Sequence, residues 1–198
     1  MSAADMIEVG QLMQRWGLAR DQGRWDVLEA CYTPEGEMHV TWYSGSARGF
    51  VEASRRTFKQ EGPRTKHLIG TPVIELNGDR ALAETTIQIL GRAVISGVAV
   101  DNLSYARFID RLVRHDGAWR IARRVAVYEK DRFDPVIPGP DFDRLMAETD
   151  FSAVPEAYRF IGHRLLDMGK ALVPGILTDG SPAAEAYRAE SEAWLATD

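Results

Sequence analysis

The sequence has a single cysteine, Cys31, and one thiol can form neither an intramolecular disulfide nor a multi-cysteine zinc site. Long apolar runs are missing as well, since no stretch approaches the ~18 consecutive apolar residues of a membrane span. The first ten residues contain acids and lack the apolar core of a signal peptide. These absences predict a soluble protein, and cytoplasmic localisation is the simplest interpretation.

The sequence also has fewer basic than acidic residues, 24 Lys and Arg against 29 Asp and Glu. The 198 residues carry a formal net charge of −5, which disfavours a general nucleic-acid binder. Apolar residues make up 45% and charged residues 27%, which is typical of a globular chain rather than a disordered one. A chain of this length is expected to form roughly one domain, with room for an appendage. Its core needs no metal or disulfide, because about 70% of the unfolded surface becomes buried.

Hydrophobic periodicity predicts that helices come first and strands come after them. Helical spacing predicts helices over residues 3–18, 25–31 and 47–61, and residues 33–36 have the composition of a turn. Alternation predicts strands over 37–43, 65–76, 80–95, 98–114 and 118–130, with tight turns at Asn77-Gly78-Asp79 and His115-Asp116-Gly117. This order indicates an α+β fold in which N-terminal helices cover a curved antiparallel sheet. Such a sheet forms a cone with a cavity inside.

A proline-rich connector over residues 133–140 separates this part of the chain from the C-terminal residues, because proline cannot continue a sheet. We therefore expect a cone domain over 1–134 and a helical C-terminal extension over 135–198. Helices are predicted over 142–147, 153–172 and 183–195. The pattern leaves open whether the extension packs on the core, on a partner subunit or over the mouth of the cavity.

Four short strings carry a family resemblance: LARDQGRW at 18–25, TKHLIG at 65–70, IELNGDRA at 74–81 and HDGAWRI at 115–121. Together with the element order, they resemble the nuclear transport factor 2-like superfamily, in particular its SnoaL-like branch with lyases of the scytalone dehydratase and hexachlorocyclohexane dehydrochlorinase type. The resemblance implies a cone-shaped α+β barrel with a catalytic Asp–His pair inside. The matching residues are Asp21 and His67, and Arg124 matches an arginine that serves the dehydrochlorinase site.

An Asp–His pair in a cavity is suited to proton transfer. The carboxylate orients the imidazole and stabilises the imidazolium, and an unperturbed histidine titrates near ~6.5. We therefore expect a lyase without metal or redox cofactor, in which His67 is the base, Asp21 orients it and Arg124 stabilises negative charge. The two-residue period leaves open whether Arg124 faces the cavity or solvent.

The substrate is expected to be a small aromatic or alicyclic molecule, because aromatic residues occur in the elements that wall the cone. The candidate binding residues are Trp25, Tyr32, Trp42, Tyr105, Tyr128 and Arg107. Family resemblance allows dehydration, dehydrohalogenation or deformylation, including cleavage of a lignin-derived diaryl compound, and so a role in aromatic compound catabolism. An isomerase or polyketide-type cyclase is one alternative, and a non-catalytic ligand-binding module is another.

The remaining histidines and the cysteine give weaker signals. His39, His115 and His163 show no metal-ligand spacing with His67, and no glycine-rich segment has the lysine of a phosphate-binding loop. We therefore expect neither a metal nor a cofactor, and we interpret Cys31 as a core residue. Open sheets of the resembled fold commonly bury their outer face against a copy, which implies a homodimer or a homotrimer.

Overall fold

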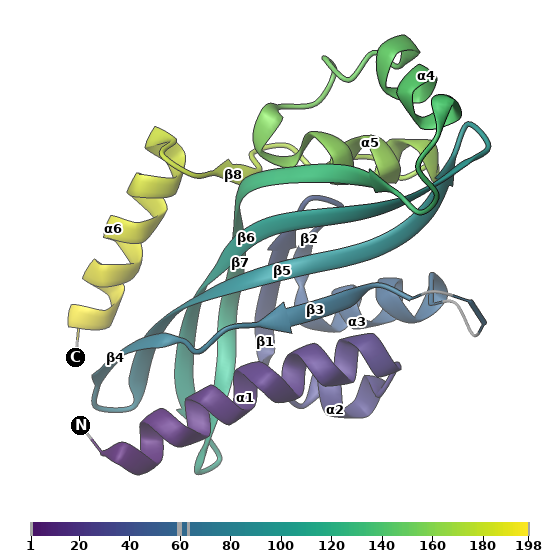
Figure 1. The fold of residues 1–198 in the computed structure, drawn as a ribbon. Coiled ribbons are helices and arrows are strands. Elements are labelled where there is room, and N and C mark those ends of the chain that lie inside the picture. Colours follow the sequence, from purple (N-terminus) through teal and green to yellow (C-terminus); the bar gives the residue numbers. More distant parts are fainter. Residues whose placement is uncertain (1, 59–60, 63, 198) are drawn as a thin grey trace.

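The computed structural model describes residues 2–58, 61–62 and 64–197, which form a curved sheet with helices on both faces (Figure 1). The helices are α1 (Ala3–Gln22), α2 (Trp25–Glu29), α3 (Ala47–Arg56), α4 (Pro140–Glu148), α5 (Arg159–Asp167) and α6 (Pro182–Ala196), with a 3-10 turn η1 (Glu156–Tyr158). The strands are β1 (Tyr32–Val40), β2 (Tyr43–Ser46), β3 (Lys66–Ile69), β4 (Val73–Asn77), β5 (Arg80–Ile95), β6 (Val98–His115), β7 (Ala118–Pro135) and β8 (Leu177–Thr178). Within the described ranges, no helix is both long and apolar enough to cross a membrane.

Helix α1 is delimited by its caps and by the spacing of its apolar residues. The Ser2 hydroxyl accepts a hydrogen bond from the backbone N of Asp5 (3.2 Å), and Gly23 ends the helix with a φ of 70°. One face is buried against the sheet, through Val9, Leu12, Met13 and Trp16. The predicted first helix and its glycine stop are confirmed. The predicted helix over 47–61 is shorter, since α3 ends at Arg56, and residues 59 and 60 of that prediction lie outside the described residues.

Strands β5, β6 and β7 form the long antiparallel meander that the alternation predicts. The turns between strands use backbone conformations that favour glycine: Gly78 has a φ of 56° and Gly117 a φ of 75°. Both predicted hairpins are therefore confirmed. The meander provides two faces, which we call inner (toward α1) and outer (toward α6).

Two predicted strands are divided in the structure. The prediction over 65–76 becomes β3 and β4, which pair with β5 at successive places along its length. Pro72 lies between them and has no N–H for a sheet ladder. The prediction over 37–43 also ends early, because the chain turns at Thr41 and Trp42 so that β2 pairs back on β1.

Strand β1 departs from a purely antiparallel sheet. It begins at Tyr32, passes through the predicted turn over 33–36, and pairs with β7 in parallel, with a register shift between Tyr32 and Glu37. Pro34 lies at this irregularity, where the ladder needs no donor. The described sheet runs β2-β1-β7-β6-β5-β3 and is not closed. The fold is thus an open cone of mixed α+β type, mostly antiparallel.

The apolar core is built on both faces of the sheet. On the inner face, Trp16 and the other buried residues of α1 pack with α3 against Phe108 and Trp119. On the outer face, Leu82 and Ile109 are covered by Tyr187 and Leu195 of α6. This part of the outer face is therefore buried within the chain itself, and homo-oligomerisation stays a prediction.

The C-terminal extension contributes to both faces. Helices α4 and α6 match the predicted ranges within a few residues, whereas the predicted helix over 153–172 is wrong in length. It comprises η1 and α5, and the chain leaves the helix at Gly169, whose φ is 73°. Ile161 and Leu165 of α5 join the inner core. The predicted division into 1–134 and 135–198 stays a prediction.

Candidate active site

A cavity of about 420 Å³ lies on the inner side of the sheet. Its walls come from α1, β1, α3, β3, the long strands and α5. The aromatic residues in these walls are Trp16, Trp42, Phe50, Phe58, Phe108 and Tyr128. The volume falls in the range of small-molecule sites, ~300–1,000 Å³, and the apolar walls with a few polar groups are typical of such sites.

Asp21 and His67 meet at the wall of this cavity. Asp21 lies in the last turn of α1, and His67 is the second residue of β3. Asp21 Oδ1 lies 2.6 Å from His67 Nδ1, and Asp21 Oδ2 accepts a hydrogen bond from the backbone N of His67 (2.8 Å). Both side chains line the cavity and are largely buried, with exposed fractions of 3% and 10%. The structure thus brings together the two residues that the sequence pairs.

The contact with Asp21 sets the tautomer of His67. A carboxylate can only accept hydrogen bonds, so Nδ1 carries the proton in the neutral ring. The lone pair then lies on Nε2, which is the atom able to take a proton from a bound molecule.

Burial also sets the charge of His67. It lowers the pKa of the imidazole below the usual 6.5, because the charged form loses hydration. The hydrogen bond and negative charge of Asp21 oppose this shift, and the positive charges of Arg20 and Arg124 add to it. At neutral pH the ring is therefore unprotonated and able to act as a base.

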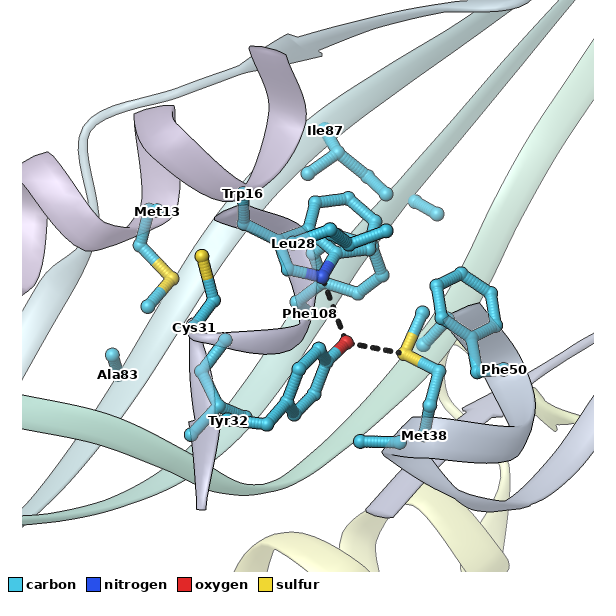
Figure 2. Close-up of a cluster of buried hydrophobic side chains, with 14 of the residues drawn as sticks. Met13, Trp16, Leu28, Cys31, Tyr32, Met38, Phe50, Ala83, Ile87 and Phe108 are labelled. Carbon is cyan, nitrogen blue, oxygen red and sulfur yellow. Dashed lines mark hydrogen bonds between the residues drawn. The ribbon is translucent and has the colours of Figure 1, made fainter. Parts of the chain in front are cut away.

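The indole of Trp16 packs against the imidazole of His67. Its ring meets that of His67 edge-on, with centroids 5.6 Å apart, and packs in the same way on Phe108 at 5.3 Å. Figure 2 shows how the indole is fixed: Trp16 Nε1 donates to the Tyr32 hydroxyl (2.7 Å), which donates in turn to Met38 Sδ (3.4 Å). These bonds restrict the ring against which His67 lies.

Arg124 faces the interior, but it does not line the cavity. Its Nε and Nη2 donate to the two carboxylate oxygens of Asp110, each at 2.7 Å. The guanidinium lies 4.4 Å from the ring centroid of Trp16 and 4.2 Å from that of Phe108. Burial raises the pKa of Asp110, and Arg124 opposes that shift. Arg124 therefore belongs to a buried ion pair behind the aromatic wall.

Two of the predicted substrate-binding residues, Trp42 and Tyr128, line the cavity. The Tyr128 hydroxyl accepts a hydrogen bond from the backbone N of Thr41 (3.2 Å), and burial raises the pKa of this phenol. It is therefore a neutral hydroxyl at physiological pH. Trp42 lies beside the Lys170 ammonium, which is 4.4 Å from its ring centroid.

The other predicted binding residues are not among those that line the cavity. Their positions are these: Trp25 lies against Phe58, Tyr32 under Trp16, Tyr105 beside Lys130, and Arg107 among Glu84, Glu129 and Asp179. Arg107 shares the outer face with Ile109, because alternate residues of a strand point to opposite sides. The two-residue alternation of this strand is visible in the sequence, but the sequence does not show whether Arg107 points to the inner or the outer face of the sheet.

Sequence reasoning did not select the basic residues of the cavity. Arg20, Arg164 and Lys170 line it, although no motif singles them out. Arg20 directly precedes Asp21, which was a signal available in the sequence. Arg164 and Lys170 belong to the extension, and no pattern indicates that α5 reaches the cavity. Asp110 was also missed, although an acid inside an apolar strand indicates a buried partner.

The remaining histidines and the cysteine lie elsewhere. His39 contacts Ser44 and Glu37, and His163 packs on Phe151. Cys31 is buried, and burial raises the pKa of its thiol to about 11. Among the residues that the structure describes, no three His, Cys, Asp or Glu side chains are grouped to hold a metal ion.

The structure is an open α+β cone with an Asp–His pair at the wall of its cavity. The family model of the SnoaL-like domain matches residues 1–125, more than half of the chain. The chain therefore belongs to the SnoaL-like family, which confirms the resemblance seen in its sequence. A search of curated proteins gives no significant match.

Solved structures show the same fold at low identity. A protein of Novosphingobium aromaticivorans described as a scytalone dehydratase is 17% identical, with a TM-score of 0.55 over 69% of this chain and 95% of that one. A type 2 hexachlorocyclohexane dehydrochlorinase is 15% identical, with a TM-score of 0.56 over 69% and 95%. The D26N variant of Rv3472, a Mycobacterium tuberculosis protein of unknown function, is 18% identical, with a TM-score of 0.55 over 87% and 100%.

Proposed function

We propose that this protein is a lyase that uses no metal or redox cofactor, with His67 as its base and Asp21 as the residue that orients the base. The observation that carries the proposal is the 2.6 Å contact between Asp21 Oδ1 and His67 Nδ1 at the wall of a cavity. Membership in the SnoaL-like family supports it. Two structural neighbours are described by names that denote eliminations, a dehydratase and a dehydrochlorinase.

The reaction that fits this pair is an elimination. His67 Nε2 takes a proton from the carbon next to the one that bears the leaving group. The electrons of that C–H bond form the new double bond, and the leaving group departs with its bonding pair. Asp21 stabilises the imidazolium that results. When the leaving group is hydroxide, the imidazolium returns its proton and water is released; a halide leaves as the anion.

The substrate that fits the walls is a small aromatic or alicyclic molecule. The rings of Trp42 and Phe50 line the cavity and can pack against a ring of the substrate, face to face or edge to face. Tyr128 is the group proposed to donate a hydrogen bond to a substrate oxygen, because its hydroxyl is neutral. A lignin-derived diaryl diol belongs to this class, and its deformylation needs the same base.

Arg124 has a different role in this proposal from the one its sequence position implies. Its Nε and Nη2 donate to Asp110, and the side chain is not among those that line the cavity, so it is not placed to meet a leaving group there. We assign it as a positioning residue that holds Trp16 and Phe108, and through Trp16 the imidazole of His67.

The experiment is a screen of wild type and His67→Ala against aryl alcohols, alkyl halides and diaryl diols without added cofactor or metal. The expected result is turnover by wild type with loss of water, halide or formaldehyde, and a rate lower by about two to four orders of magnitude in His67→Ala. Circular dichroism and the melting temperature check that the variant is folded.

The products decide between the candidate functions. An unsaturated product identifies a lyase, whereas an isomer of the substrate identifies an isomerase or cyclase that uses the same pair. Equal rates in wild type and a folded His67→Ala would remove His67 as the base. Binding of aromatic compounds without any turnover would favour a ligand-binding module.

A further inference from the structure

Positive charge is concentrated in the cavity, although the chain as a whole is acidic. Five basic side chains line the cavity, against two carboxylates. One of these carboxylates, Asp21, is occupied at both oxygens by His67. The other, Asp167, is exposed at the end of α5. Among the described residues, neither carboxylate forms a salt bridge with an arginine or lysine of the cavity walls.

Arg164 of α5 is the most deeply buried of these basic residues. Its exposed fraction is 8%, and its Nε is buried without a hydrogen-bond partner among the described residues. The guanidinium lies over Gly91 of β5, where an added Cβ would come within 2.6 Å of Nη1. Burial without a counter-charge lowers its pKa. An unpaired buried charge is costly, and a negatively charged group bound beside Arg164 would offset that cost.

Two more cations face the same space. The Arg20 guanidinium lies 5.9 Å from the ring centroid of Phe50, and the Lys170 ammonium lies 4.4 Å from that of Trp42. Within the described part of the chain, neither side chain forms a salt bridge or a hydrogen bond. Burial and the positive charges of Arg20 and Arg164 lower the pKa of Lys170, so both arginines repel this ammonium.

A comparison with Arg92 shows that this arrangement is specific. Arg92 also lines the cavity, but its Nε and Nη2 donate to the two oxygens of Asp101, each at 2.7 Å. The chain therefore neutralises this arginine internally and leaves Arg164 without an acid. Arg20, Arg164 and Lys170 line the cavity without a salt bridge in the described part of the chain, and we call these three residues the cationic cluster.

We propose that the cationic cluster binds a carboxylate of the substrate, so that the substrate is an aromatic carboxylic acid. Guanidinium groups hold carboxylates through paired N–H donors, and the nearby rings accept the aromatic body. This inference rests on the proposed function for the reaction after binding, but not for the binding itself. Arg164 and Lys170 lie beyond the matched SnoaL-like region, so the C-terminal extension provides substrate specificity.

The test is calorimetric binding of 2-naphthoate, its neutral isostere 2-naphthamide and 2-naphthyl phosphate to the whole chain. Wild type is expected to bind the carboxylate about tenfold or more tightly than the amide. Arg164→Gln is expected to remove most of that difference, with little effect on amide binding. Arg92→Gln is the matched control, and its preference for the carboxylate should stay within about twofold of wild type.

Two further variants keep the test decisive. Arg20→Gln removes a partly buried charge on another helix, so it tests the cluster even where Arg164→Gln does not fold. His67→Ala should still bind 2-naphthoate, which separates failure of the base from failure of the cationic cluster. Equal or unmeasurable binding of carboxylate and amide by wild type would overturn the proposal. An unchanged preference in the arginine variants, or a clear preference for the phosphate ester, would overturn it too.

Discussion

Asp21 holds His67 at two points, the ring and the backbone. Its Oδ1 meets ring Nδ1 at 2.6 Å, and its Oδ2 accepts from the backbone N of the same residue at 2.8 Å. One carboxylate on α1 therefore fixes both the start of β3 and the orientation of the imidazole. Because the two bonds use different oxygens, a substitution can disturb one and keep the other.

Asp21→Asn is expected to separate these two functions. The amide oxygen of asparagine still accepts from the backbone of His67, while its NH2 group donates to Nδ1 and moves the ring proton to Nε2. The base then lacks its lone pair, and kcat should fall by about three to four orders of magnitude with a small change in melting temperature. A variant with nearly wild-type kcat would contradict the assigned tautomer.

The pH dependence of kcat/KM should report the pKa of His67. The base acts in its neutral form, so activity is lost as pH falls through this pKa. Burial lowers the pKa, so the midpoint of the acid limb is expected below 6.5.

The protein should also lose stability as pH falls from 6.5 toward the pKa of His67, because the unfolded chain binds the proton more tightly. A histidine NMR titration, assigned with His67→Gln, checks the value; a midpoint above 6.5 would be inconsistent with the account.

Arg124→Met should act mainly on stability. The substitution leaves the buried Asp110 carboxylate without its partner, which is expected to cost about 3–5 kcal/mol in the free energy of unfolding. The double variant Arg124→Met, Asp110→Leu should recover much of that loss, because no unpaired charge remains. Urea denaturation measures both. A double variant as unstable as the single one would show that the pair does more than neutralise its own charges.

Tyr32→Phe tests whether this residue supports the cavity wall or touches the ligand. The change leaves the Trp16 indole N–H buried without its acceptor, at an expected cost of about 1–3 kcal/mol in stability. Affinity for 2-naphthoate should stay close to that of wild type, because Tyr32 does not line the cavity. Calorimetry and thermal unfolding on the same sample separate the two effects. Loss of affinity at unchanged stability would place Tyr32 in contact with the ligand instead.

The sequence contains enough local information to predict most of the fold. Glycine at positive φ marks the two hairpins, and the spacing from Val9 to Trp16 marks the buried face of α1. The parallel pairing of β1 with β7 was not predictable, because nothing local to Tyr32 indicates which strand it will meet. The resemblance around Asp21 and His67 indicated the pair, and the structure brings the two side chains within 2.6 Å of each other.

The remaining parts of the candidate site depend on contacts between distant elements. Alternation shows that Arg107 and Phe108 face opposite sides, but only the packing of α6 identifies the outer side. Arg164 reaches the cavity because α5 folds back over β5 near Gly91, and no periodic pattern encodes that return. The role of Arg124 depends on Asp110, its neighbour across the β6–β7 ladder.

The most direct test of the central claim is chemical rescue of His67→Ala with the best substrate from the screen. The account predicts that kcat falls by about two to four orders of magnitude and that added imidazole restores part of it, because a free base then occupies the space beside Asp21. Asp21→Asn should show no such rescue, since its histidine still fills the site. Turnover by a folded His67→Ala at the wild-type rate, without imidazole, would show that His67 is not the base.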